Sequence, residues 1–162
     1  MNSFMSWVGG KKALREEIVK RLPLNYGRYI EVFGGGGWVL FHKEPDKFEV
    51  YNDFNQNLVN LYRCVKEKPE ELIKWLEFSL DSRADFEYMT NRLKDDDLSD
   101  CQRAAYYYSL NIIAYPPTNC NCPRPSKMPP CSTFGAVRRH KFSMKFLRYA
   151  RMGSMAAARA SF

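Results

Sequence analysis

The 162-residue sequence has no continuous apolar run of the roughly 18 residues that a membrane-spanning helix needs. Residues 1–4 (Met-Asn-Ser-Phe) also lack the layout of a secretory signal peptide. The five cysteines are an odd number without a regular framework, which fits a reducing compartment better than a disulfide scaffold. We therefore expect a soluble, cytoplasmic protein with one domain's worth of chain and no membrane partner.

Acidic residues are absent from the last third of the chain. All 18 of them precede residue 111, whereas nine of the 25 basic residues lie within residues 111–162. In an ordinary domain about one residue in eight is acidic, so chance rarely leaves so long a stretch without one. The same stretch holds six of the nine prolines. The composition therefore separates a nearly neutral portion, residues 1–110, from an irregular basic tail, residues 111–162.

The first portion shows alternating helical and strand patterns. Apolar residues at helical spacing predict a helix at residues 12–22, and β-branched or aromatic runs predict buried strands at residues 28–33 and 48–51. Further helices are predicted at residues 38–42, 55–66, 69–78, 85–93 and 100–110, and a short basic helix at residues 142–149. This order of elements predicts an α/β fold with a Rossmann-like parallel sheet that is incomplete.

Four consecutive glycines, residues 34–37, follow the first predicted strand. Glycine permits positive φ and lets the backbone approach a ligand closely, and open α/β sheets bind ligands at the carboxyl ends of their strands. Asp53 ends the next predicted strand about 20 residues further on, where an acceptor for ribose hydroxyls belongs. A flexible turn would explain the glycines alone. Together with Asp53 they favour a site for an adenosine-containing ligand.

A second motif, Trp-Val-Gly-Gly-Lys, occupies residues 7–11 before the first helix. The two glycines form a turn that presents Lys11, whose ammonium can meet a carboxylate, and the indole of Trp7 can cover a flat ligand. Taken alone, these residues are more typical of an anchor and a loop.

Together these segments resemble the Dam-like adenine-specific DNA methyltransferases. That family has, in order, a Trp/Tyr-x-Gly-Gly-Lys segment, a Glu-Pro-Phe-x-Gly-x-Gly turn and an Asp-x-Asn element. This sequence has matching segments at residues 7–11, 31–37 and 53–55, with Val32 where proline is usual. Residues 102–110 are similar to a later helix of many members, so the resemblance covers about residues 3–110.

The resemblance implies an S-adenosylmethionine-dependent methyltransferase fold that transfers a methyl group to the exocyclic amino group of adenine in double-stranded DNA. It implies that Trp7 and Lys11 contact the cofactor, with Lys11 near its carboxylate, and that Asp53 holds the ribose hydroxyls. The residues implied to shape the cofactor pocket are Glu31, Phe33, Gly35 and Gly37.

The catalytic segment of that family, Asp-Pro-Pro-Tyr, does not occur in this sequence. Members use it to accept the amino hydrogens of a flipped adenine and to stack on the base. The nearest string, Tyr-Pro-Pro-Thr at residues 115–118, has Tyr in place of the acid and Thr in place of the aromatic residue, and a proline-rich loop explains it better. We assign no catalytic residue and expect a copy truncated before this motif, with weak or no activity.

Two explanations for the basic tail stay open. It can be a natural arm that binds DNA phosphates, or the product of a reading frame that shifted near residue 111. The coincident loss of acids, periodicity and resemblance favours the frameshift, and translation of the other frames after codon 110 would decide. Cys120, Cys122, Cys131 and His140 match no common zinc spacing, so we predict no metal site. The alternatives to an enzyme are a DNA-binding or cofactor-binding remnant without catalysis; another nucleotide-binding enzyme is a further rival.

Overall fold

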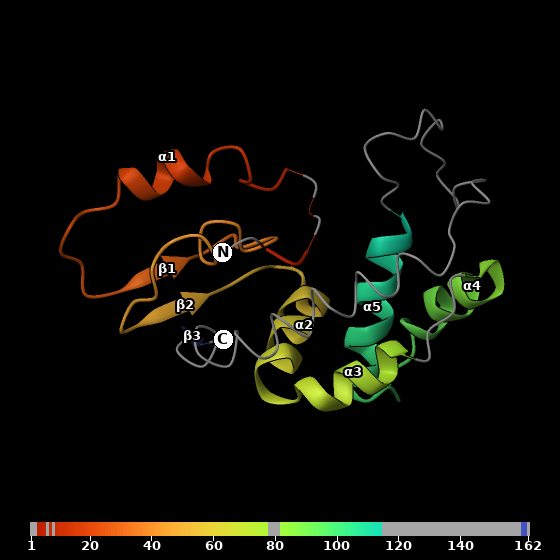
Figure 1. The fold of residues 1–162 in the computed structure, drawn as a ribbon. Coiled ribbons are helices and arrows are strands. Elements are labelled where there is room, and N and C mark those ends of the chain that lie inside the picture. The colour runs from red at the N-terminus through yellow and green to blue at the C-terminus, as the bar shows by residue number, and fades with distance from the viewer. Residues whose placement is uncertain (1–2, 6, 8, 78–81, 115–159, 162) are drawn as a thin grey trace.

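The computed structural model describes residues 3–5, 7, 9–77, 82–114 and 160–161 (Figure 1). The predictions for the tail beyond residue 114, including the helix at residues 142–149 and the cysteine-rich loop, lie outside these residues except at the last strand. The elements in chain order are α1 (Arg15–Lys20), β1 (Tyr29–Glu31), β2 (Glu49–Tyr51), α2 (Gln56–Glu67), α3 (Pro69–Glu77), α4 (Arg83–Arg92), α5 (Asp100–Ala114) and β3 (Ala160–Ser161).

The strands form a small parallel sheet in the order β1-β2-β3. Ile30 pairs with Val50, and Val50 pairs with Ser161 on its other side. Since all described strands run in one direction, their carboxyl ends lie at one edge, which faces the helices α2–α5 in Figure 1. The protein therefore has a mixed α/β fold with a small parallel sheet.

The connection between β1 and β2 corrects one prediction. A helix was expected at residues 38–42, but the chain there forms consecutive turns, with Phe41 N–H donating to the carbonyl of Gly37 and Lys43 N–H to that of Val39. The stretch is bounded by the glycine run and by Pro45, so it is too short to propagate a regular helix.

The strands are also shorter and less buried than predicted. Expected at residues 28–33, the first strand is limited to Tyr29–Glu31, and Ile30 within it is 54% exposed. Glu31 on the other side of the strand is buried. A strand covered on one face alternates in burial, and the apolar run had suggested cover on both faces.

The helix expected at residues 12–22 is limited to α1, Arg15–Lys20. Helix predictions after β2 match the structure more closely. Asn55 caps α2, accepting hydrogen bonds from the backbone of Asn57 and Leu58, and Pro69 occupies the first turn of α3 as its fixed φ favours. α5 begins at Asp100 as predicted but continues to Ala114. The helix therefore crosses the compositional boundary at residue 111.

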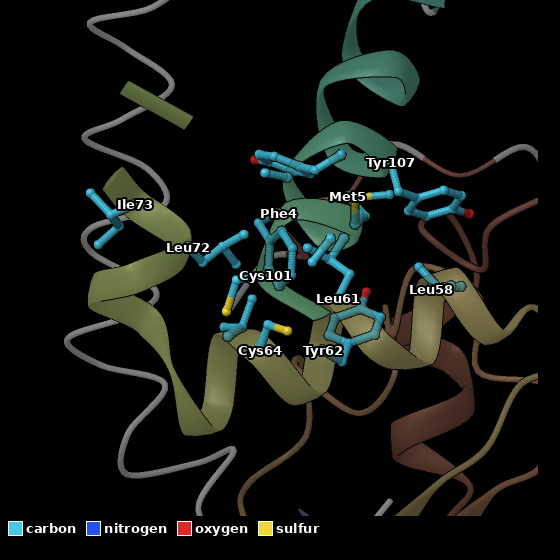
Figure 2. Packing of buried hydrophobic residues seen from close by; sticks show 14 of the residues in the cluster. Phe4, Met5, Leu58, Leu61, Tyr62, Cys64, Leu72, Ile73, Cys101 and Tyr107 are labelled. Atoms are coloured by element: carbon cyan, nitrogen blue, oxygen red, sulfur yellow. The ribbon is translucent and has the colours of Figure 1, made fainter. Parts of the chain in front are cut away.

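The core lies mainly among α2, α3 and α5 (Figure 2). Its buried members are Phe4, Met5, Tyr51, Leu58, Leu61, Tyr62, Cys64, Val65, Leu72, Ile73, Cys101, Ala104, Ala105, Tyr107 and Tyr108. Phe4 comes from the start of the chain, yet its ring lies 5.2 Å from that of Tyr62 on α2 and 5.9 Å from that of Tyr108 on α5. This packing fixes the N-terminal segment beside the carboxyl ends of the strands.

Within the described residues, no helix is both long and apolar enough to span a bilayer.

Candidate functional site

The chain turns sharply after β1, and its glycines are required sterically. Gly35 and Gly37 have φ values of 50° and 62°, in the left-handed region that side chains disfavour. The ring of Tyr51 from β2 fills the space that a Cβ at Gly34 would occupy. The Tyr51 hydroxyl donates to the carbonyl of Gly35 at 2.7 Å, so the next strand holds this glycine corner, residues 34–37, in place.

The N-terminal segment packs directly on the corner. A Cβ added at Gly35 would lie 2.8 Å from Cδ1 of Trp7, closer than real Cβ contacts. Gly9 has a φ of 72°, and Gly10 N–H donates to the carbonyl of Trp7 at 3.1 Å, which closes the turn that leads to Lys11. Trp7 therefore contacts the glycine corner, and the turn that follows it brings Lys11 to the end of β1.

Lys11 joins the segment to β1. Its ammonium donates to the carboxylate of Glu31 at 3.2 Å and to the carbonyl of Phe33 at 2.9 Å. Glu31 is only 6% exposed, and its carboxylate also accepts hydrogen bonds from the backbone of Leu40 and the hydroxyl of Tyr29. Burial raises the pKa of Glu31, and the positive charge of Lys11 opposes that rise. This ion pair therefore places a buried carboxylate and a partly exposed ammonium beside the corner.

Asp53 contacts the corner from the end of β2. One carboxylate oxygen accepts the N–H of Gly35 at 2.8 Å, and the other accepts the N–H of Asn55 at 2.9 Å. Each oxygen of a carboxylate has two lone pairs, so each can accept a further donor. Asp53 thus presents acceptor groups next to backbone that only glycine can form.

Two large aromatic side chains near the corner are exposed. Phe33 is 77% and Phe54 is 93% exposed, although phenylalanine is usually buried. Phe33 was among the predicted site residues, whereas Phe54 was not. The feature of the sequence that could have identified Phe54 was its position directly after Asp53. Tyr51 was also missed, because its contact with Gly35 arises only when the strands pair.

The structure thus brings all the predicted site residues to one place. Gly35 is contacted by both Trp7 and Asp53. An ion pair between Lys11 and Glu31 lies next to them. Phe33 directly precedes the corner, and Gly37 is its last residue, where an added Cβ would lie 2.8 Å from the ring of Phe41. Among the described residues, no group of three His, Cys, Asp or Glu side chains could hold a metal ion.

This donor set fits an adenosylated amino acid chemically. Carboxylate oxygens at Asp53 can accept from sugar hydroxyls, exposed rings can cover an aromatic base, and an ammonium can meet a carboxylate. A parallel sheet with a glycine turn at the carboxyl end of a strand is typical of α/β nucleotide-binding proteins.

Comparison with known proteins identifies the family. The model of the D12 class N6 adenine-specific DNA methyltransferases matches residues 7–149, which is most of the chain. The chain therefore belongs to this family.

Curated relatives agree with the family match. The chain is 36% identical over 118 residues to the Type II methyltransferase M1.LlaDCHI of Lactococcus lactis, an alignment covering 69% of this chain and 41% of that protein. It is 34% identical over 134 residues to the Type II methyltransferase M.MjaIII of Methanocaldococcus jannaschii, covering 69% and 45%. A DNA adenine methylase of Haemophilus influenzae is 30% identical over 150 residues, covering 90% and 51%.

The alignments also show how much of each relative this chain covers. The chain spans about half the length of the curated relatives it matches. The family match continues to residue 149, farther than the motifs at residues 3–110 had indicated. Part of the basic tail therefore falls within the matched range.

Proposed function

We propose that this chain carries the cofactor-binding part of a DNA adenine methyltransferase, that the cofactor is S-adenosylmethionine, and that the sheet is of the Rossmann-like methyltransferase type. The observation that carries the proposal is the contact of two other segments with Gly35: Trp7 of the N-terminal segment lies against it, and the end of β2 binds it through Asp53, which accepts its N–H, and Tyr51, which donates to its carbonyl.

In this proposal each residue has a defined task. Asp53 accepts hydrogen bonds from the ribose hydroxyls while Gly35 and Asn55 hold its carboxylate. Lys11 offers its charge to the carboxylate of the methionine part. Glu31 keeps the ammonium at the corner, since a buried acid with a partner is far more stable than one without.

The remaining predicted residues shape the pocket. Trp7 and Phe33 cover the ligand, and Gly35 and Gly37 let the backbone approach it. S-adenosylmethionine, when bound, supplies an electrophilic methyl group on its sulfonium.

Double-stranded DNA is the proposed partner, with the exocyclic amino group of adenine as the methyl acceptor. This nitrogen is a weak nucleophile because its lone pair is delocalised, so transfer needs a flipped base and an acceptor for the amino hydrogens. The sequence has no Asp-Pro-Pro-Tyr segment for that step. We therefore propose that the 162-residue chain by itself binds the cofactor and transfers methyl groups weakly or not at all.

Calorimetric titration of the 162-residue chain with S-adenosylmethionine tests the cofactor proposal. Asp53→Ala should weaken binding by about tenfold or more, because it removes a charged acceptor whose hydrogen bonds contribute about 1.5–3 kcal/mol. Asp97→Ala is the matched control, since Asp97 is an exposed acid paired with Arg92 away from the corner. A folded chain that does not bind S-adenosylmethionine, or that prefers ATP in competition, would contradict the proposal.

A radiolabelled methyl-transfer assay on double-stranded DNA tests the second part. Transfer near the detection limit is expected for this chain alone, and rapid turnover would contradict the proposed weak activity. DNA binding that weakens with salt and is unaffected by cofactor would instead support a DNA-binding remnant without catalysis.

A further inference from the structure

We infer that Tyr107 of α5 is a positioning residue for Asp53 and acts through Asn55. The inference rests on the proposed function, because it concerns the acid that would hold the ribose. It adds a residue from the helical core, about 50 positions away in sequence from the site it serves.

A continuous chain of hydrogen bonds carries the inference. The side-chain amide of Asn55 donates from Nδ2 to the hydroxyl oxygen of Tyr107 at 3.0 Å. The backbone N–H of Asn55 donates to Oδ1 of Asp53 at 2.9 Å, and Oδ2 of Asp53 accepts the N–H of Gly35 at 2.8 Å. The helical core and the glycine corner are thereby connected through two side chains.

Tyr107 can influence Asp53 through Asn55 because both ends of the Asn55 side-chain amide are hydrogen-bonded. Its Oδ1 accepts from the backbone N–H groups of Asn57 and Leu58 at 3.1 and 3.2 Å, as the cap of α2. Its Nδ2 must then point the other way, toward Tyr107. With both ends engaged, the orientation of the residue that donates to Asp53 is restricted.

Tyr107 is a fixed point for this amide. It is 9% exposed within the buried cluster, on a helix that packs against α2, α3 and α4. Figure 2 shows its ring extending from α5 toward the end of α2 that carries Leu58. Asp53 itself is only half-buried at a strand end, so its carboxylate depends on its partners for orientation.

Two variants remove the hydrogen bond between Asn55 and Tyr107 while keeping the packing of α5 and the cap of α2. Tyr107→Phe keeps the ring in the core and deletes the acceptor oxygen. Asn55→Ser keeps a good cap for α2 and deletes the amide donor. Tyr106→Phe is the matched control on the same helix, because the ring of Tyr106 lies among those of Trp75 and Tyr88, away from the corner.

The first measurement uses the protein without cofactor. Exchange of the Gly35 amide proton with deuterium, followed by NMR, should become about threefold faster or more in Tyr107→Phe and Asn55→Ser, because Asp53 accepts that N–H less persistently. Tyr106→Phe should leave it unchanged. In an Asp53→Ala background, Tyr107→Phe should have no further effect on Gly35. An unchanged rate in Tyr107→Phe, or an equal acceleration without Asp53, would overturn the inference.

The second measurement is titration with S-adenosylmethionine. Tyr107→Phe should weaken binding about fivefold, as expected for loss of one orienting hydrogen bond, whereas Tyr106→Phe should bind as the unaltered chain does. Equal binding by Tyr107→Phe and Tyr106→Phe would overturn the inference. Failure of the unaltered chain to bind would refute the proposed function, and the exchange measurement would still decide whether Tyr107 positions Asp53.

Discussion

Replacing Gly35 with alanine adds one carbon atom at the point where the glycine corner, the N-terminal segment and the end of β2 meet. The backbone there has a φ of 50°, which costs an L-residue about 1–2 kcal/mol relative to glycine. The new Cβ would also lie 2.8 Å from Cδ1 of Trp7 and 2.9 Å from its Nε1, so the indole must move. Overpacking of this kind costs about 1–3 kcal/mol. We expect Gly35→Ala to destabilise the chain by about 2–5 kcal/mol in total.

Gly27→Ala is the control for this prediction, because no atom lies within 4 Å of the place that its Cβ would take and its φ is not positive. It should change stability by less than about 1 kcal/mol. Urea unfolding monitored by tryptophan fluorescence gives both values, and calorimetry shows whether Gly35→Ala also weakens S-adenosylmethionine binding. If the two variants unfold at the same urea concentration, the steric account of the corner is refuted.

Three further predictions concern stability. Lys43 is buried in contact with the buried carboxylate of Glu49, so Lys43→Met should cost about 3–5 kcal/mol by leaving that charge unpaired; an unchanged urea midpoint would contradict this. Ser82 accepts the N–H of Asp85 at the start of α4, so Ser82→Ala should cost about 1 kcal/mol in the same assay, and no loss would mean that the cap is unimportant. Burial raises the pKa of Glu31 above its ordinary value of 4.5, so folding favours the protonated acid. Stability should therefore fall as pH rises through this raised pKa, and Glu31→Gln should remove that part of the urea midpoint's pH dependence; an identical pH profile would refute it.

The sequence alone predicted the local elements whose signals lie within a few residues. The helices predicted at residues 55–66 and 69–78 are confirmed to within about a residue at each end. The Asn55 cap and the fixed φ of Pro69, which define where these helices begin, depend only on neighbours in the chain. The prediction at residues 38–42 was wrong for a related reason. The prediction used the apolar character of residues 38–42 alone. It did not weigh how few residues separate the glycine run from Pro45, too few to propagate a regular helix.

The candidate site shows the same division. Motif order was sufficient to select Trp7, Lys11 and Asp53, and the family match agrees with the resemblance on which they were chosen. Phe54 and Tyr107 were not selected, since exposure and a contact across about 50 positions depend on how α2 and α5 pack. The positioning role of Tyr107 stays a prediction for the experiments above.

By itself, the sequence determined the family, the order of the elements and the glycines that make a tight corner possible, because these depend on residue type and spacing. Only the tertiary structure decided that Trp7 lies on Gly35 and that Asn55 meets Tyr107. Such contacts join segments far apart in the chain, and they exist only after the helical core has packed around Phe4 and brought the segments together.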